Sequence, residues 1–257
     1  MPETFDPIPW DALNDGHMQL SEKVAMHLRE LIVSGQIKQG TFLRIENIAS
    51  TLGISPTPVR EGLLLLRSES LVRMIPRRGF MVNSFTKQDV FDLFWAQATI
   101  GGELAARAAT VMSDAEIEQL MQLHANYEKA IKGGDERLTG RTGHEFHRAI
   151  NLAAQSHRLA NLLGSLTRQL PNRFYANIEG NLTTAVEFHT IILGAIKVRD
   201  PDAARSLMFR HINEAGQRLV EMLDRRGLWG MENSSPTIPS KRPKGQKAAA
   251  DKPSRKR

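Results

Sequence analysis

The stretch LGISPTPVRE at residues 52–61 joins two short segments whose apolar residues have helical spacing. The first segment shows the i, i+3, i+4, i+7 pattern of one helix face, at Ile45, Ile48, Ala49 and Leu52. Gly53 is suited to end that helix, because glycine readily takes the left-handed conformation found after a helix C-terminus. Ser55 or Thr57 can cap the next helix, and a proline after either one is tolerated in a first helical turn. This pattern predicts a helix-turn-helix, whose second helix enters the major groove of DNA.

Two short β-prone runs follow the second helix. Residues 71–75 and 80–82 are mostly apolar and are joined by the turn PRRG at residues 76–79. This arrangement predicts a β-hairpin with two arginines at its tip, and residues 42–44 can add a short strand to it. Such a basic hairpin is a wing, which can place guanidinium groups against DNA phosphates or in the minor groove.

Residues 28–82 contain an ordered series of matches that resembles the winged-helix domain of the GntR family of bacterial transcription regulators. The matches are Leu28-Arg29-x-x-Ile32-x-x-Gly35, Gly40-Thr41-x-Leu43, Ile48-Ala49-x-x-Leu52-Gly53-Ile54-Ser55, Thr57-Pro58-Val59-Arg60-Glu61 and Arg78-Gly79-Phe80-x-Val82. The alternative interpretation, a proline-containing loop before a core helix, explains only one part of this series. The resemblance implies a winged helix-turn-helix domain at residues 19–83 that binds double-stranded operator DNA.

The resemblance also implies which residues face DNA. Arg60 is the strongest candidate, since arginine reads guanine O6 and N7 with two hydrogen bonds. Hydroxyl groups at the start of the second helix can donate to phosphates, and the helix dipole there favours an anion. Any one arginine taken alone also fits a solvated surface charge, and their convergence on one motif favours DNA contact. The full set of candidates is Arg44, Ser55, Thr57, Pro58, Arg60, Arg77, Arg78 and Gly79.

The positive charge of the folded chain is concentrated in the segment that contains these motifs. The 257 residues have a formal net charge of +6 and no cysteine. Residues 17–84 hold nine basic and five acidic side chains, whereas residues 85–240 hold seventeen and eighteen. A basic folded region fits nucleic-acid binding. The absence of cysteine excludes disulfides and thiolate chemistry and fits a reducing cytoplasm.

The two ends of the chain show little sign of a folded core. Residues 1–18 are acidic, have no clear period and lack the form of a secretory signal, so they predict an N-terminal arm. Residues 231–257 are rich in Pro, Lys and Arg and predict a disordered basic tail. This tail either attracts DNA phosphates non-specifically or only aids solubility. No run approaches the roughly 18 apolar residues of a membrane span, and we expect a cytoplasmic protein.

Residues 84–230 predict helices throughout, because strand-like alternation is missing and capping sequences recur. The predicted starts are Thr86 with Asp89, Ser113 with Glu116, Thr142 with Glu145, and Asp200 with Pro201. The third of these helices can instead begin nearer Asp135. Gly227 is predicted to end the last helix. We expect about six helices, or one more if the chain breaks near Ser156 or Pro171, in an antiparallel bundle. The fold class is therefore mainly α, with an N-terminal winged helix-turn-helix (α+β) and a C-terminal all-α bundle.

This helical half resembles the C-terminal effector domain of the FadR branch of the GntR family. The matching residues are Glu145-Phe146-His147, His189-x-x-Ile192-x-x-Ala195-Ile196-x-x-x-Asp200, Ala203-Ala204 and His211. In many members of that branch, three histidines and one aspartate hold a divalent metal ion inside the bundle. The resemblance assigns the three histidines to His147, His189 and His211, whereas the aspartate position is Gly143.

A metal site is one of three interpretations of these histidines. Three imidazoles can bind Zn²⁺ or Ni²⁺ and leave open positions for an effector carboxylate. Without the aspartate the site loses one ligand and one negative charge, although His144 is near enough to substitute. In the second interpretation the histidines line a polar pocket and bind an anion or water directly. In the third they are ordinary buried side chains with satisfied hydrogen bonds.

Two further positions bear on the effector. The FadR branch often has Arg and, four residues later, Glu in the first helix of this domain, where this chain has Gln97 and Gly101. An amide donates hydrogen bonds but lacks the charge-assisted grip of arginine on a carboxylate. The arginines considered as compensation are Arg107, Arg148 and Arg173. The predicted lining of the effector pocket is Gln97, Gly143 and His144.

Together these features predict a ligand-responsive transcription regulator with no catalytic residues. We expect a homodimer on a palindromic operator, and a small organic acid in the bundle that shifts the population able to span both half-sites. We expect the protein to repress transcription and the acid to relieve this repression, with activation of transcription as the other possibility. One alternative is a metal-responsive regulator, in which the ion on the three histidines is the signal. A remoter one is a metal-dependent hydrolase, although the sequence has no nucleophile–base motif.

Overall fold

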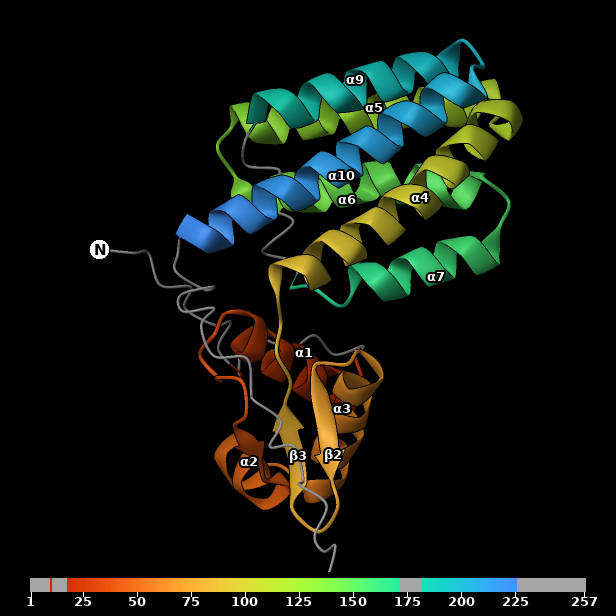
Figure 1. The fold of residues 1–257 in the computed structure, drawn as a ribbon. Helices are drawn as coiled ribbons and strands as arrows, with labels where there is room; N and C mark the ends of the chain where they lie inside the picture. The colour runs from red at the N-terminus through yellow and green to blue at the C-terminus, as the bar shows by residue number, and fades with distance from the viewer. Residues whose placement is uncertain (1–9, 11–17, 172–181, 226–257) are drawn as a thin grey trace, which may run out of the picture.

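The computed structural model describes residues 10, 18–171 and 182–225 (Figure 1). The first elements are α1 (Leu20–Val33), β1 (Phe42–Leu43), α2 (Ile45–Leu52), α3 (Pro56–Ser68), β2 (Val72–Ile75) and β3 (Gly79–Val82). The helices that follow are α4 (Lys87–Val111), α5 (Asp114–Lys132), α6 (Glu136–Ala153), α7 (His157–Thr167), α9 (Leu182–Lys197) and α10 (Pro201–Arg225). This arrangement confirms the predicted fold class. Nearly all of the predicted arm and the whole predicted tail lie outside the described residues.

The helix-turn-helix consists of α2 and α3 with the predicted turn between them. Gly53 follows α2 with φ of 66°, in the left-handed region that glycine adopts without strain. Ser55 precedes α3 with an extended backbone, but its side chain makes no capping hydrogen bond, and Thr57 lies inside the helix. α3 packs on α1, and a Cβ added to Gly62 would lie 2.9 Å from the Ser21 carbonyl oxygen. Glycine therefore permits this close approach of the two helices.

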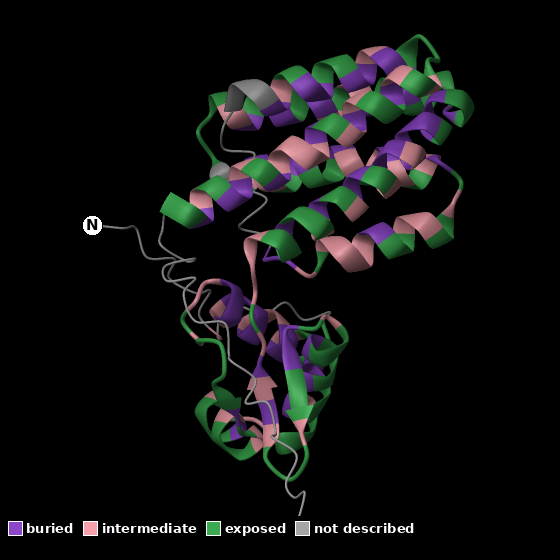
Figure 2. Cartoon of the chain, viewed as in Figure 1, coloured by how far each residue is buried: buried purple, intermediate pink, exposed green. Residues whose placement is uncertain are grey.

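The wing is a three-stranded antiparallel sheet with the strand order β1-β3-β2. β1 pairs with β3 through Phe42 with Met81 and Leu43 with Phe80. The short strand predicted at this place is therefore confirmed, except that Arg44 lies outside it and precedes α2. Alternate residues of β3 are buried against the helices (Figure 2), which is the expected pattern for a sheet with one face on the core.

α4 and α10 form the centre of the helical half. α6, α7 and α9 contact α4, and α5 packs on α6 and α9 (Figure 1). The two central helices run antiparallel, since Phe94 lies against Gly216 whereas Gly101 lies against Met208 and Ile212. A Cβ added to Gly216 would lie only 2.6 Å from the Cβ of Phe94. These glycines therefore bring the two helices closer together than larger residues would allow.

The helix starts agree in part with those predicted. The two capping boxes that form as predicted are Thr86 with Asp89 and Ser113 with Glu116. α6 begins after Asp135, whose carboxylate accepts the backbone N–H of Leu138 at 2.9 Å, so Thr142 lies within the helix. The chain breaks near Ser156 between α6 and α7, and the predicted end at Gly227 lies outside the described residues. In the described ranges no helix is long and apolar enough to cross a bilayer.

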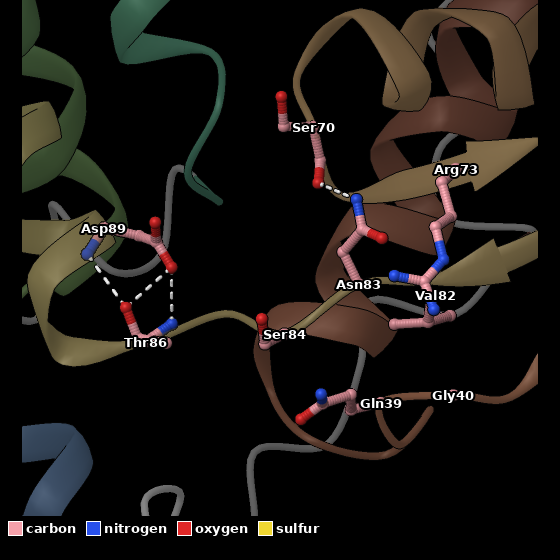
Figure 3. Close-up of a pocket in the computed structure, with 9 residues that line it drawn as sticks. All are labelled: Gln39, Gly40, Ser70, Arg73, Val82, Asn83, Ser84, Thr86 and Asp89. Carbon is pink, nitrogen blue, oxygen red and sulfur yellow. Dashed lines mark hydrogen bonds between the residues drawn. The ribbon is translucent and has the colours of Figure 1, made fainter. Parts of the chain in front are cut away.

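Residues 83–86 connect the wing to α4 without regular structure. The Asn83 side chain donates to the Ser70 carbonyl oxygen at 2.6 Å, which fixes the start of this connection to the wing. A cleft of about 400 Å³ lies beside it, lined by residues of the wing, the connection and the start of α4 (Figure 3). At the other end of the connection, Lys87 Nζ lies 2.9 Å from Asp224 Oδ1. The first turn of α4 is thereby tied to the last turn of α10.

Candidate nucleic-acid interface and ligand site

The N-terminal end of α3 presents polar side chains to solvent. Ser55, Thr57 and Arg60 are exposed, and Pro58 is half-buried. Val59, on the opposite face of the same turn, is fully buried and holds the helix on the domain core. Pro56 and Pro58 have no backbone N–H, so of the first three residues of α3 only Thr57 offers one, and the helix dipole favours an anion such as a phosphate at this end. This end of α3 can therefore approach DNA without any loss of core packing.

The wing tip adds arginines at the same end of the domain. Arg77 and Arg78 are exposed in the turn between β2 and β3, and Gly79 follows with φ of 95°, which favours glycine. Because Leu43 pairs with Phe80, the exposed Arg44 lies beside this turn. The tip points away from the helical bundle (Figure 1). α3 ends at Ser68 and leads into Val72, the end of β2 that lies away from the wing tip. The N-terminus of α3 therefore lies at the same end of the domain as the wing tip.

Three histidines from three helices meet inside the bundle. His147 comes from α6, His189 from α9 and His211 from α10. The Nε2 atom of His147 lies 3.2 Å from the Nε2 atom of His189 and 3.2 Å from that of His211. His189 and His211 are buried, and His147 is half-buried. The helical packing therefore brings together the three residues that the sequence assigned to one site.

Burial keeps these histidines uncharged. It lowers the pKa of His147 to about 4, and the nearby His144 is a smaller cause of the same sign. Burial also lowers the pKa of His189 and His211 well below the usual value, and repulsion from neighbouring histidines adds to the effect. Neutral imidazole is the form that binds metal ions. At neutral pH all three rings are thus ready to act as ligands.

The spacing of the Nε2 atoms suits a metal ion. Tetrahedral ligands with Zn–N bonds of about 2.0–2.1 Å lie about 3.3 Å from one another, close to the two distances of 3.2 Å. The Nδ1 atoms of His189 and His211 are buried and have no hydrogen-bond partner in the described part of the chain. Metal-bound histidines usually have such a partner, and so do ordinary buried histidines. The geometry therefore fits a metal ion with three histidine ligands, but among the described residues the Nδ1 atoms of His189 and His211 lack the hydrogen bonds that metal-bound histidines usually make.

The position of the expected fourth ligand carries no side chain. Gly143 lies in α6 one turn before His147 and is buried. His144 is exposed and is not among the residues whose ligand atoms cluster. A site at this place therefore has three protein ligands in the described residues and no carboxylate.

An aromatic shell surrounds the histidines. The Phe146 ring stacks on His189 with a centroid distance of 4.3 Å, and the Tyr127 ring lies 4.7 Å from the same imidazole. His124 Nε2 lies 3.0 Å from Thr190 Oγ1, and its ring is 6.1 Å from that of His189. The sequence analysis did not connect His124 or Tyr127 with the site. Only the packing of α5 on α9 brings these residues together.

Two positions of α4 differ from the pattern of the FadR branch, and both face the interior of the bundle. Gln97 is buried, and Gly101 lies one turn later against α10. A Cβ at Gly101 would lie 2.7 Å from Ile212 Cδ1, so a side chain at this position would require the end of Ile212 to move. Arg107 and Arg148 are exposed and do not compensate for the neutral amide. Arg173 lies outside the described residues.

Arg218 is the charged residue that the sequence interpretation missed. It lies on α10 seven residues after His211, and its side chain is only 21% exposed. Its Nη1 atom lies 3.6 Å from Glu214 Oε2, and its charge is one of the causes that lower the pKa of His211. Seven residues are nearly two helical turns. This spacing to a predicted ligand was the one signal in the sequence that could have identified it.

Comparison with known proteins covers both halves of the chain. The family model described as "Bacterial regulatory proteins, gntR family" matches residues 20–82, and the FCD domain model matches residues 92–214. The first range contains the winged helix-turn-helix, and the second contains the three histidines. Both matches agree with the resemblances noted in the sequence.

Several known proteins align with most of this chain. The chain is 26% identical over 203 residues to the HTH-type transcriptional regulator YdhC of Bacillus subtilis, which covers 77% of this chain and 89% of that protein. It is also 26% identical over 194 residues to a probable D-xylose utilization operon transcriptional repressor of Paenarthrobacter nicotinovorans, with 74% and 85% covered. The structure of E. coli McbR/YncC shares the fold, with a TM-score of 0.58, 22% identity and 81% and 99% coverage. The chain therefore belongs to the GntR family of bacterial transcription regulators, in the FadR-like branch that joins a helix-turn-helix domain to an FCD domain.

Proposed function

We propose that this protein is a ligand-responsive repressor that binds a palindromic operator as a homodimer in the cytoplasm. The observation that carries the DNA-binding part is the meeting of the α3 N-terminus and the wing-tip arginines at one exposed end of the domain. Phosphate contacts fix the register of a protein on DNA, and base contacts give the sequence preference. Arg77 and Arg78 take the first role in this proposal, and Arg60 takes the second.

The dimer contact is assigned to the exposed face of α4. Phe91 and Trp95 lie one turn apart and are 38% and 59% exposed. Leu162 of the neighbouring α7 is 49% exposed. Exposed apolar and aromatic side chains in one region mark protein interfaces more often than solvated surface. Two copies joined here would present two winged helices to DNA.

The bundle is the proposed site of the effector, a small organic acid. His147, His189 and His211 would hold Zn²⁺ or Ni²⁺ in this site, and the ion would supply a Lewis acid for a carboxylate oxygen. α10 carries His211 and ends at the ion pair of Asp224 with Lys87, next to the connection between the domains. A change in helix position on ligand binding therefore has a physical route to the winged domain.

Selection from a random DNA pool tests the DNA-binding part. We expect enrichment of a short palindrome, which fluorescence anisotropy at fixed salt should bind about 10³-fold or more tightly than random DNA of equal length. Equal affinity for the two DNAs would contradict the proposal. With the selected operator upstream of a reporter gene, the protein should lower expression, whereas raised expression would replace repression by activation.

A further inference from the structure

Two arginines of α10 flank the same glutamate but differ in burial. Arg210 precedes Glu214 by four residues and Arg218 follows it by four, with nitrogen–oxygen distances of 3.4 and 3.6 Å. The Arg210 side chain is 64% exposed, whereas that of Arg218 is 21% exposed. The Arg218 Nε atom is buried and has no hydrogen-bond partner among the residues that the structure describes. A buried donor of a charged group without an acceptor costs free energy, so this guanidinium has room for an acceptor at Nε in addition to the Glu214 carboxylate near its Nη1.

The side chain of Arg218 extends toward the histidine cluster. His211 and Arg218 lie on the same face of α10, and the helical rise separates their backbones by roughly 10 Å. Helical side chains lean toward the helix N-terminus, and the contact of Arg218 with Glu214 follows that direction. This leaves about one helical turn, roughly 5 Å, between the guanidinium group and the imidazoles.

The facing helix α4 places Gln97 at the same level. Phe94 lies against Gly216, and Gly101 lies against Ile212. Gln97, between them on the inner face of α4, therefore faces the stretch of α10 that separates the imidazoles from Arg218. Its amide can add hydrogen bonds to a ligand there but no charge.

We propose that Arg218 is the anion-recognition residue of the effector site and binds one carboxylate of a short dicarboxylic acid whose other carboxylate faces His147, His189 and His211. This inference rests on the proposed function, in which an organic acid binds the bundle. Arg218 supplies from α10 the positive charge that Gln97 does not supply from α4. Gly143, without a carboxylate, leaves the histidine end of the site free of repulsion toward an anion.

The expected ligand follows from this spacing. An arginine and a carboxylate form two parallel charge-assisted hydrogen bonds, and the second carboxylate must reach imidazoles roughly one helical turn away. Malonate, succinate and glutarate span this range of lengths. Acetate has only one of the two groups and should bind weakly.

Isothermal titration calorimetry with acetate, malonate, succinate and glutarate, at constant ionic strength, tests the inference. The wild-type protein, purified without chelator, is compared with Arg218→Gln, Arg218→Lys and the matched control Arg210→Gln. We expect at least one of the three diacids to bind the wild type, Arg218→Gln to weaken binding about tenfold or more, and Arg210→Gln to keep it within about twofold. Arg218→Lys keeps the charge but loses the two-pronged contact, so it should give an intermediate loss.

Three results would overturn the inference: no diacid binds the wild type, Arg218→Gln binds as tightly as the wild type, or Arg210→Gln loses as much as Arg218→Gln. Circular dichroism shows whether each variant folds, and if Arg218→Gln does not, the comparison of Arg218→Lys with Arg210→Gln decides. Operator affinity without acid is measured separately by anisotropy. A wild type that binds diacid but no operator would contradict the proposed function and leave the Arg218 site standing.

Discussion

Arg60 is the residue whose loss should affect operator recognition most. It is exposed near the N-terminus of α3, whereas Arg67 is exposed in the last turn of the same helix. We expect Arg60→Ala to weaken operator binding by about 1–3 kcal/mol if it reads a base, and Arg67→Ala to have little effect. Fluorescence anisotropy on the selected operator measures both. Equal losses in the two variants would assign Arg60 to general attraction instead of recognition.

The low pKa of His147 makes the metal-free protein sensitive to acid. Its pKa is about 4 in the folded state and about 6.5 in an unfolded chain, so the unfolded state binds more protons between these values. Stability contributed by the neutral ring is present above pH of about 6.5 and is lost as the pH falls toward 4. Because the ring is half-buried, this loss is at most about 3 kcal/mol.

Urea unfolding of chelator-treated protein between pH 7.5 and 4.5 measures this dependence. His147→Asn should reduce the pH dependence, and the part that comes from the lowered pKa values of His189 and His211 should remain. The exposed His157 at the start of α7 provides the control variant His157→Asn. A His147→Asn variant that loses as much stability on acidification as the wild type would contradict the expectation.

At the scale of elements, the contact of α4 with α10 depends on glycine. Gly216→Ala puts a Cβ within 2.6 Å of Phe94 and should lower the free energy of unfolding by about 1–3 kcal/mol. Gly194 lies inside α9 with nothing within 4 Å of an added Cβ, so Gly194→Ala should raise stability by about 0.5–1 kcal/mol. Urea unfolding midpoints compare the stability of the two variants. If both substitutions raise stability, helix propensity dominates over the clash at Gly216.

The exposed face of α4 should govern the oligomeric state. Trp95 is 59% exposed on α4, and Val198 is 74% exposed in the turn before α10. Trp95→Arg should weaken the dimer by about 2 kcal/mol or more, as expected for a central interface aromatic, and Val198→Arg should not. Analytical ultracentrifugation over a dilution series measures the dissociation constants, and an unchanged dimer in Trp95→Arg would place the interface elsewhere.

Elements with strong local signals were predictable from the sequence. Gly53 ends α2 because the left-handed conformation costs glycine little, and Asp89 completes a capping box that needs only its own turn. Two competing caps, Asp135 and Thr142, could not be separated locally. In the structure Asp135 starts α6, so the later signal lies inside the helix. Local sequence therefore specifies that a helix begins but not always which cap it uses.

At the scale of the molecule, the candidate site was only partly predictable. His147, His189 and His211 were assigned by resemblance, and the packing of α6, α9 and α10 brings their Nε2 atoms together. For Arg218 the sequence offers only the spacing of seven residues from His211, and the low exposure of its side chain is a property of the folded bundle. Such features depend on contacts between helices far apart in the sequence, which no local pattern contains.

The tight glycine contact between α4 and α10 also determines how a small movement of these helices is transmitted to the winged domain. The two helices have little room to slide, so they should tilt as one lever, and about 20 Å of helix separates the level of His211 from Asp224. A tilt of about 5° would then displace the paired ends at Lys87 and Asp224 by about 2 Å. In a two-fold dimer the same displacement would occur twice, so the two winged domains would separate by about 3.5 Å, which is about one base-pair step.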